Sequence, residues 1–289
     1  MKLKHILTFV IFIPIFIFSC SDCDDDNNNN DVNINEVIPK TYISKVTITE
    51  GPLFYHFPNS ITSYQLNYDA NKKLISIDVE NTRDEDGITM TYNANYLMVY
   101  ENNQIIKAYT DCATNDCEWY FISQVDGYHQ ISFEYDLENG FKSVIGFEQI
   151  ENTTGTITSS YEIGRYLLNP NNLVKRVEDN TEIIYSNNNI VGIQNSSSYN
   201  DGLQYLNYDD KKSVVIFTDD AHVMDIGDYF VRLILDLKYS KNNFRQLNFS
   251  FRNQHQLIDF EYDNSNRPIK RTVFNNDILN YEEAFEYLE

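Results

Sequence analysis

The chain has 289 residues, a formal net charge of −21 at pH 7 and a pI near 4.5. Contacts with phosphates depend on clusters of Lys and Arg, so this charge balance excludes nucleic acid as a partner. Tyr (22) and Phe (18) are abundant while Gly (10) is scarce, which excludes collagen-like and low-complexity classes and favours strands, where aromatic side chains pack well.

The N-terminal segment has the pattern of a targeting signal. Lys2 and Lys4 supply positive charge, residues 6–18 are almost wholly apolar, and Ser19 follows. The apolar run is shorter than the about 20 residues that a membrane-spanning helix needs, but it suits a secretory signal. We therefore predict that residues 1–19 are a signal peptide.

The end of this segment resembles a bacterial lipoprotein signal, in which a small residue precedes the Cys that receives the lipid. Ile17 is the aliphatic residue usual three places before that Cys. The resemblance implies that Cys20 is lipid-modified and anchors the protein to the outer membrane; an ordinary signal peptide with an incidental Cys20 is the alternative. Ser21 and Asp22, followed by three Asp residues at 24–26, look like the export signal of Bacteroidota surface lipoproteins, interrupted by Cys23. We expect display on the cell surface, with the periplasmic face as the alternative.

Residues 20–38 are acidic and rich in Asn, and they contain little that could be buried. Such a composition is typical of a flexible tether. No Pro- or Gly-rich linker divides the chain after it, so we predict a single β domain over residues 39–289. Residues 41–49 are rich in β-branched residues and are expected to form the first strand.

A repeated unit organises this domain. In residues 68–77 an aromatic residue closes one strand, a run of Asp, Asn and Lys reverses the chain, and aliphatic residues open the next strand. Asn and Gly suit the reversal because both tolerate positive φ. Variants recur at residues 135–141, 185–191, 208–215, 239–244 and 262–266. The flanking segments alternate apolar and polar residues, as half-buried antiparallel strands do.

The spacing of 23 residues from Tyr185 to Tyr208, and again from Tyr239 to Tyr262, matches one hairpin per unit. We therefore predict an all-β fold, a many-stranded antiparallel meander of repeated hairpins that forms a curled sheet or a barrel. We do not expect this sheet to span the membrane, because the lipid supplies an anchor and the last residue is Glu289 instead of a terminal aromatic residue.

The unit resembles the YD repeat of large bacterial surface proteins, whose core is Tyr-Asp, two turn residues, Gly, a basic residue and Leu. Tyr68-Asp69 and Tyr262-Asp263 match the start of this core, and Lys73-Leu74 matches its end. Lys72 and Asn266 replace the Gly. With the lipoprotein signal, the whole chain resembles uncharacterised Bacteroidota lipoproteins with a porin-like β fold, which implies a curled sheet or barrel and no known activity.

No catalytic motif is present: the sequence lacks GxSxG, P-loop, GxGxxG and HExxH patterns. The five histidines are scattered, and we expect His129 and His255 to lie in or beside turns, exposed to solvent. We therefore predict no catalytic residue, no cofactor and no metal site, and we do not expect an enzyme. A hydrolase would need a cleft with converging carboxylates.

Cys112 and Cys117 flank a short polar segment. In an oxidising compartment a disulfide between them is a better interpretation than a zinc site, because no pair of histidines accompanies them. Such a bridge would stiffen a binding loop that includes Trp119 and Tyr120.

These patterns predict a non-catalytic binding or scaffold module, attached to the membrane by its lipid, whose ligand is a glycan or a surface protein. Tyr with Asn and Asp on a surface suits sugars, although the same residues also serve as strand ends and turns. The alternative is a carrier for an apolar small molecule or lipid inside the curled sheet, which requires an unfilled interior.

Overall fold

The computed structural model describes residues 42–51, 59–85, 87–112, 114–115, 127–138, 140–169, 174–177, 181–195, 203–213, 240–249 and 254–289. Within these ranges all regular secondary structure is strand. The strands are β1 Ile43–Glu50, β2 Ile61–Tyr68, β3 Leu74–Glu85, β4 Ile88–Glu101, β5 Gln104–Asp111, β6 Gly127–Glu138, β7 Phe141–Asn152, β8 Ile157–Leu168, β9 Val174–Val177, β10 Thr181–Ser186, β11 Asn189–Asn195, β12 Leu203–Leu206, β13 Gln246–Phe249, β14 Gln254–Tyr262, β15 Pro268–Asn275 and β16 Ile278–Tyr287.

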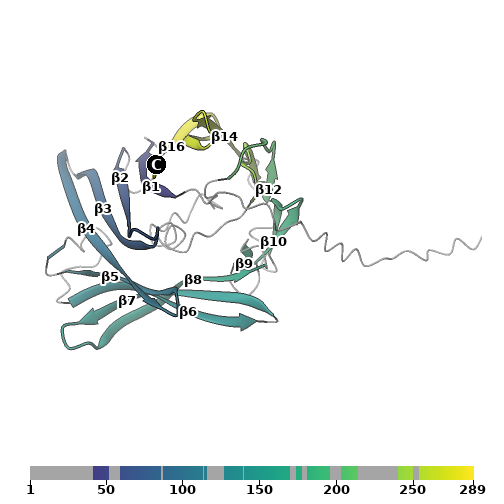
Figure 1. Ribbon diagram of the computed structural model, residues 1–289. Coiled ribbons are helices and arrows are strands. Elements are labelled where there is room, and N and C mark those ends of the chain that lie inside the picture. Colours follow the sequence, from purple (N-terminus) through teal and green to yellow (C-terminus); the bar gives the residue numbers. More distant parts are fainter. Residues whose placement is uncertain are drawn as a thin grey trace, which may run out of the picture. The chain divides into compact units, whose positions relative to one another are not determined.

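Every strand pairs antiparallel with the strands before and after it in the chain, and β1 pairs with β16. This last pairing, in which Val46 lies opposite Phe285, closes the order of strands into a barrel. Figure 1 shows β1 beside β16, where the two ends of the meander meet. The prediction of an all-β antiparallel meander is confirmed. The described residues include no helix long and apolar enough to cross a membrane.

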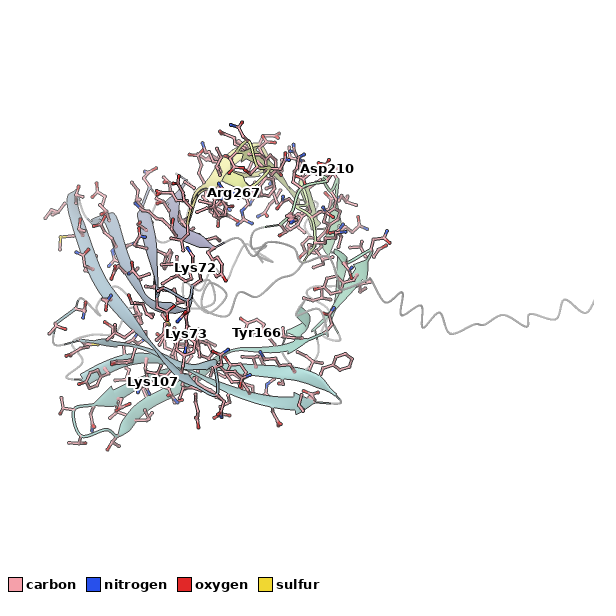
Figure 2. All side chains as sticks on the ribbon, in the orientation of Figure 1. Lys72, Lys73, Lys107, Tyr166, Asp210 and Arg267 are labelled. Carbon is pink, nitrogen blue, oxygen red and sulfur yellow. The ribbon has the colours of Figure 1, made fainter. Side chains whose placement is uncertain are left out.

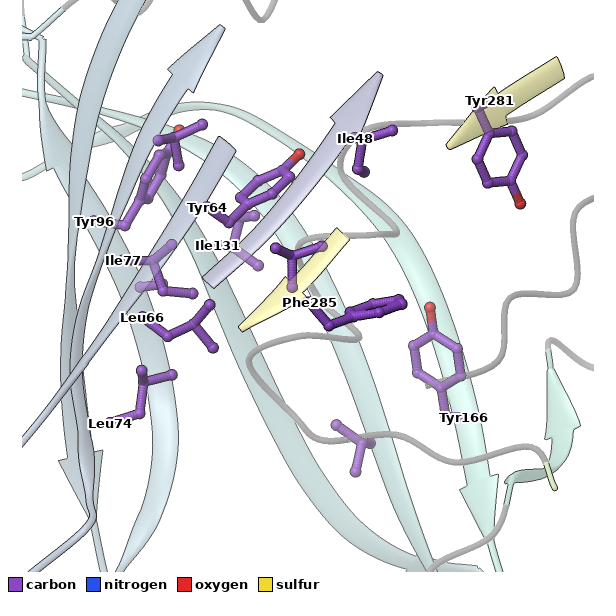
Figure 3. Close-up of a cluster of buried hydrophobic side chains, with 14 of the residues drawn as sticks. Ile48, Tyr64, Leu66, Leu74, Ile77, Tyr96, Ile131, Tyr166, Tyr281 and Phe285 are labelled. Atoms are coloured by element: carbon purple, nitrogen blue, oxygen red, sulfur yellow. The ribbon is translucent and has the colours of Figure 1, made fainter. Parts of the chain in front are cut away.

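One face of the sheet is apolar and buried. Buried apolar side chains from most of the strands belong to one cluster, and in several strands they alternate along the chain, for example Val46 and Ile48 of β1 and Tyr64 and Leu66 of β2. Figure 3 shows part of this cluster, with side chains from strands far apart in the sequence. Five of the largest fully buried side chains are tyrosines, namely Tyr64, Tyr96, Tyr166, Tyr205 and Tyr281. Large rings therefore fill space along the inner face.

We call six tyrosines near or just beyond the ends of even-numbered strands the tyrosine rim. They are Tyr68, Tyr100, Tyr135, Tyr208, Tyr262 and Tyr287. The Tyr68 hydroxyl at the end of β2 donates a hydrogen bond to the Ile43 carbonyl at the start of β1 (2.9 Å). Equivalent bonds run from Tyr100 to Leu74 (2.6 Å), from Tyr135 to Ile105 (2.7 Å), from Tyr208 to Ile190 and from Tyr287 to Pro268 (2.5 Å). Each bond fastens the end of one strand to the beginning of its neighbour.

A shift of register precedes several of these tyrosines. The pairing of β2 with β3 shifts between Asn67 and Tyr68, and that of β4 with β5 shifts between Val99 and Tyr100. Such a bulge changes the direction of a side chain at the end of a strand. Burial raises the pKa of the Tyr100 hydroxyl to about 12, because the charged form would lose its hydration.

The turns next to the rim explain the Tyr-Asp dipeptide. The Asp69 carboxylate accepts hydrogen bonds from the backbone N–H groups of Asn71 (2.8 Å) and Lys73 (2.9 Å). Lys72 has φ +61°, so the position that is Gly in the YD repeat needs a left-handed backbone here too. The second copy is the same: Asp263 accepts from Ser265 and Arg267 (both 2.8 Å), and Asn266 has φ +59°.

The basic residue of the unit stacks on the rim. Lys73 Nζ lies 3.6 Å from the centroid of the Tyr100 ring, and Arg267 Cζ lies 4.7 Å from that of Tyr287. In both cases the cation of one unit contacts the tyrosine of the following unit, an attractive arrangement with the face of an aromatic ring. Figure 2 shows Lys73 and Arg267 on their turns.

Candidate functional site

The end of the barrel opposite the tyrosine rim carries the connections from odd-numbered to even-numbered strands, and we call it the loop rim. Its connections are residues 51–60, 86–87, 112–126, 153–156, 178–180, 196–202, 250–253 and 276–277. Among these, the connection of residues 112–126 is the one in which the sequence predicts a binding loop. Cys117, Trp119 and Tyr120 lie outside the described residues, as do Cys20 and Cys23.

The base of this connection is well anchored. The Cys112 N–H donates a hydrogen bond to the Gly127 carbonyl (2.9 Å), and the Asn95 N–H donates to Asn115 Oδ1 (3.1 Å). Gly127 has φ +150°, and a Cβ there would collide with the Glu151 carbonyl of β7. Glycine is therefore required where β6 leaves the connection. Asn115 ties the connection to β4, so it begins and ends on rigid strands.

Cys112 is disulfide-bonded. This state agrees with the prediction that the cysteine is oxidised, and it excludes a free thiol at the start of the connection. The pairing with Cys117 stays a prediction, because Cys117 is not among the described residues.

Below this connection, the outward side of β5, β6 and β7 carries two tyrosines surrounded by polar groups. Tyr109 of β5 and Tyr128 of β6 contact each other edge to face, with ring centroids 6.0 Å apart and planes at 73°. Both side chains are half-buried. We call Lys107, Tyr109, Tyr128, Gln130, Gln149 and Glu151 the β5–β7 surface.

Amide side chains continue this surface across the strands. Gln130 Nε2 donates to Gln149 Oε1 (2.9 Å), and the Ser132 hydroxyl donates to the same oxygen (2.9 Å). Gln149 Nε2 in turn donates to Ser160 Oγ of β8 (3.2 Å). Because each amide is held by its neighbours, its orientation is set before any ligand arrives.

An ion pair borders the two rings. Lys107 Nζ lies 3.1 Å from Glu151 Oε2, and it also lies 5.4 Å from the centroid of the Tyr109 ring. The two charged side chains are 29% and 22% exposed, so the pair contributes at most about 1 kcal/mol to stability. Its chief effect is to place one cation and one carboxylate beside the tyrosines (Lys107 is labelled in Figure 2). Aromatic rings, planar amides and charged hydrogen-bonding groups thus meet on one face.

The inner face contains a buried row of hydrogen-bonded polar side chains. The prediction that His129 is a solvated turn residue is wrong: it lies in β6 and is fully buried. The Tyr96 hydroxyl lies 2.7 Å from His129 Nδ1, and His129 Nε2 lies 2.5 Å from Glu148 Oε1. This row links β4, β6 and β7, and its three side chains are at most 5% exposed. These contacts give the buried polar groups their hydrogen-bond partners and join the three strands.

A second buried cluster lies on β15 and β16. Arg271 Nε lies 2.5 Å from Glu283 Oε2, and an Arg271 NH2 group donates to the Tyr281 hydroxyl (3.1 Å). The side chains of Arg271 and Glu283 are 3% and 0% exposed. Removing one partner of such a pair would leave an uncompensated buried charge, which typically costs about 3–5 kcal/mol.

Both clusters could have been found in the sequence from strand phase. His129 is two residues before Ile131, Arg271 is two residues before Val273, and Glu283 is two residues before Phe285. Side chains two residues apart in a strand share a face, so each of these polar residues is on the side of a buried apolar residue. The residue types alone suggested turns and surface.

No group of three or more His, Cys, Asp or Glu residues within the described ranges is arranged to hold a metal ion. Asp84 accepts a hydrogen bond from the Gly87 N–H (2.8 Å) at the turn between β3 and β4. Residues 81–85 belong to β3, so β3 and β4 form a long hairpin.

Two of the solved structures that are similar to this chain are porin-like proteins. One is a porin-like protein from Bacteroides uniformis ATCC 8492, with 12% identity and a TM-score of 0.47, covering 86% of this chain and 98% of that one. The other is a porin-like protein from Bacteroides vulgatus ATCC 8482, with 13% identity and a TM-score of 0.36, covering 86% and 99%. No family model matches the chain. No curated protein matches it either.

Proposed function

We propose that this chain is a non-catalytic binding module, attached by a lipid on Cys20 to the bacterial outer membrane, and that the β5–β7 surface with the connection above it binds a glycan. The observation that carries the proposal is the Tyr109–Tyr128 pair within a preset frame of amides and charges. Tyr109 and Tyr128 offer apolar ring surface to a sugar, while the half-buried Gln149 amide and the ion pair offer hydrogen bonds to its hydroxyl groups. Gln130 is buried and holds Gln149 in place. Rigid strands below a variable connection are a common setting for binding residues.

The outward face of the sheet supports an anchored module instead of a membrane-spanning barrel. Alternate residues of β3 on this face are polar, namely Ser76, Asp78, Glu80 and Thr82. A lipid-facing band must be apolar over about 25 Å, and a charged residue near its middle costs up to about 4 kcal/mol. Asp78 and Glu80 are exposed in the middle of β3, where lipid would penalise them.

The carrier alternative is weakened by the inner face. Fully buried tyrosines and the two buried polar clusters, around His129 and around Arg271, occupy positions where an apolar ligand would need free space. We therefore retain glycan binding as the proposed function and a protein ligand as the alternative at the same surface.

A glycan array tests the proposal. We expect wild-type protein to bind a subset of glycans and the Tyr109→Ala/Tyr128→Ala variant to lose at least tenfold in affinity. Tyr92→Ala is the matched control, because Tyr92 is a half-buried tyrosine on β4 outside the β5–β7 surface. Equal binding by both variants, or binding to no glycan, would contradict the proposal.

The anchor is tested by metabolic labelling with a fatty acid. We expect wild-type protein to be labelled and to fractionate with the outer membrane, and Cys20→Ser to be unlabelled and released. Cys23→Ser is the control, and its labelling should be unchanged. Label that persists in Cys20→Ser would rule out this attachment site.

A further inference from the structure

β8 has two halves that differ in their pairing. Residues Tyr166–Leu168 pair with both β7 and β9. From Ile157 to Arg165 the strand pairs with β7, and no other described residue pairs with its second edge. All six residues from Ile157 to Glu162 are exposed, including Ile157 (41%) and Tyr161 (52%). Since neighbouring side chains point to opposite faces, side chains on both faces are accessible here.

This edge lacks most of the devices that protect exposed strands. Residues 157–161 are Ile-Thr-Ser-Ser-Tyr, a segment of good strand formers without Pro, Lys or any charge. Register shifts place one extra residue at Thr158 and another at Ile163, which leaves Ser159–Glu162 regular. An open row of backbone N–H and C=O groups over such a segment is a template for another strand.

The charge distribution favours a second copy of this chain as the partner. The protein carries a net charge of −21, so most of its surface repels another copy. At this edge residues 157–161 are neutral, and Glu162 is matched by Arg165, whose Nε and NH2 groups lie 3.1 Å and 3.0 Å from its two oxygens. Two copies can therefore approach here without opposing like charges.

We propose that two copies pair through β8, antiparallel and about a two-fold axis near Ser160, so that the sheets of two barrels become continuous. An edge of six residues buries less than the about 1,200 Å² usual for a stable complex, so the pairing is weak in solution. Confinement to a membrane raises the effective concentration. That last step rests on the proposed lipid anchor, whereas the edge itself does not depend on the anchor or on glycan binding.

Cysteine cross-linking of the full chain in cells tests the pairing. Single Ser159→Cys, Ser160→Cys and Tyr161→Cys variants are oxidised, and Thr272→Cys on β15 is the control. A two-fold axis brings one β8 position opposite itself, so we expect a cross-linked dimer that is strongest at one of the three positions and at least tenfold weaker at Thr272. Adding Thr158→Lys should reduce the dimer at least fivefold, and circular dichroism checks that the fold is kept.

Three results would overturn the proposal. One is the absence of a dimer although a maleimide reagent labels each β8 cysteine, since the edge would then be open but unpaired. Another is protection of these cysteines from maleimide without a dimer, which indicates a different cover. The third is a cross-linked product larger than a dimer of this chain, which identifies another protein as the partner. The cross-linking and labelling results do not depend on whether the Tyr109→Ala/Tyr128→Ala variant loses glycan binding.

Discussion

The two ends of the barrel follow different rules. At the tyrosine rim one arrangement recurs around the ring: a hydroxyl bonded to a neighbouring carbonyl, and an Asp that organises the turn. The connections vary in length at both ends, from two residues (102–103) to 39 (207–245) at the tyrosine rim and from two (276–277) to fifteen (112–126) at the loop rim. The two ends therefore differ in their bonding and not in the regularity of their connections. A hydroxyl–carbonyl bond that recurs suits a structural role, because it fastens neighbouring strands in the same way at each site. The connection above Tyr109 and Tyr128 lies at the loop rim, where we expect recognition.

Two tyrosines of one strand give the most direct test of the difference between the tyrosine rim and the loop rim. Tyr135 and Tyr128 both lie in β6, the first at the tyrosine rim and the second near the loop rim. Tyr135→Ala removes a ring and a bonded hydroxyl, and we expect it to lower the free energy of unfolding by about 3–4 kcal/mol. Tyr128→Ala removes a half-buried ring and its contact with Tyr109 but no hydrogen bond, so we expect a smaller loss of about 1–2 kcal/mol together with impaired binding. Urea unfolding measures both, and equal losses would mean that the ends do not differ.

A milder change isolates the hydroxyl. Tyr135→Phe keeps the ring but leaves the Ile105 carbonyl without its donor, so we expect a loss of about 1–2 kcal/mol. The control is Tyr128→Phe, because the Tyr128 hydroxyl has no hydrogen-bond partner among the described residues, and its stability should not change. A loss below about 0.5 kcal/mol in Tyr135→Phe would show that the rim bonds are incidental.

Alkaline pH tests the rim collectively. Burial raises the pKa of Tyr100, Tyr135 and Tyr208 from the usual 10 to about 12. The folded state then keeps protons that the unfolded chain has lost, so the stability contributed by these groups is complete below pH 10 and is lost as the pH rises towards 12. We expect the urea midpoint to fall over this range, and to fall less steeply in Tyr135→Phe. A pH-independent midpoint would contradict these shifts.

The smallest effect concerns the turn. Lys72→Gly relieves a side chain at φ +61°, a gain of about 1–2 kcal/mol that the greater freedom of unfolded Gly partly offsets. We expect a net stabilisation of about 0.5 kcal/mol. Asn266→Gly should gain less, since Asn already tolerates this backbone. Thermal unfolding of the two variants side by side decides the matter, and destabilisation at position 72 would show that the Lys side chain is needed there.

The sequence predicted the Tyr-Asp turns well and the rest of the barrel partly. A turn is determined by neighbouring residues, so Tyr68, Asp69 and Lys72 could be assigned from their order alone. The bond from Tyr68 to Ile43 could not, because it joins two strands whose register depends on the packed sheet. His129 was misassigned because its residue type suggested solvent while its phase with Ile131 indicated the core.

The sequence predicted the region of the candidate site but not the residues that form it. The cysteines at 112 and 117 drew attention to one connection, but Tyr109 and Tyr128 looked like ordinary strand residues. Their contact arises because Tyr109 pairs with Gln130, two residues from Tyr128, so the two rings are diagonal neighbours on one face. Without the register of β5 on β6 this diagonal cannot be assigned.

The closure of β1 on β16 has a consequence for the folding rate. All other pairings join consecutive strands, and except for β12–β13, whose connection has 39 residues (207–245), the connections have at most fifteen residues and close with little loop-closure entropy. The β1–β16 pairing joins the two ends of the meander and bears the entropic cost of nearly the whole chain. We therefore expect an open meander to accumulate first and closure to be the slow step. A Val46→Ala substitution at this seam should accelerate unfolding more than it slows folding.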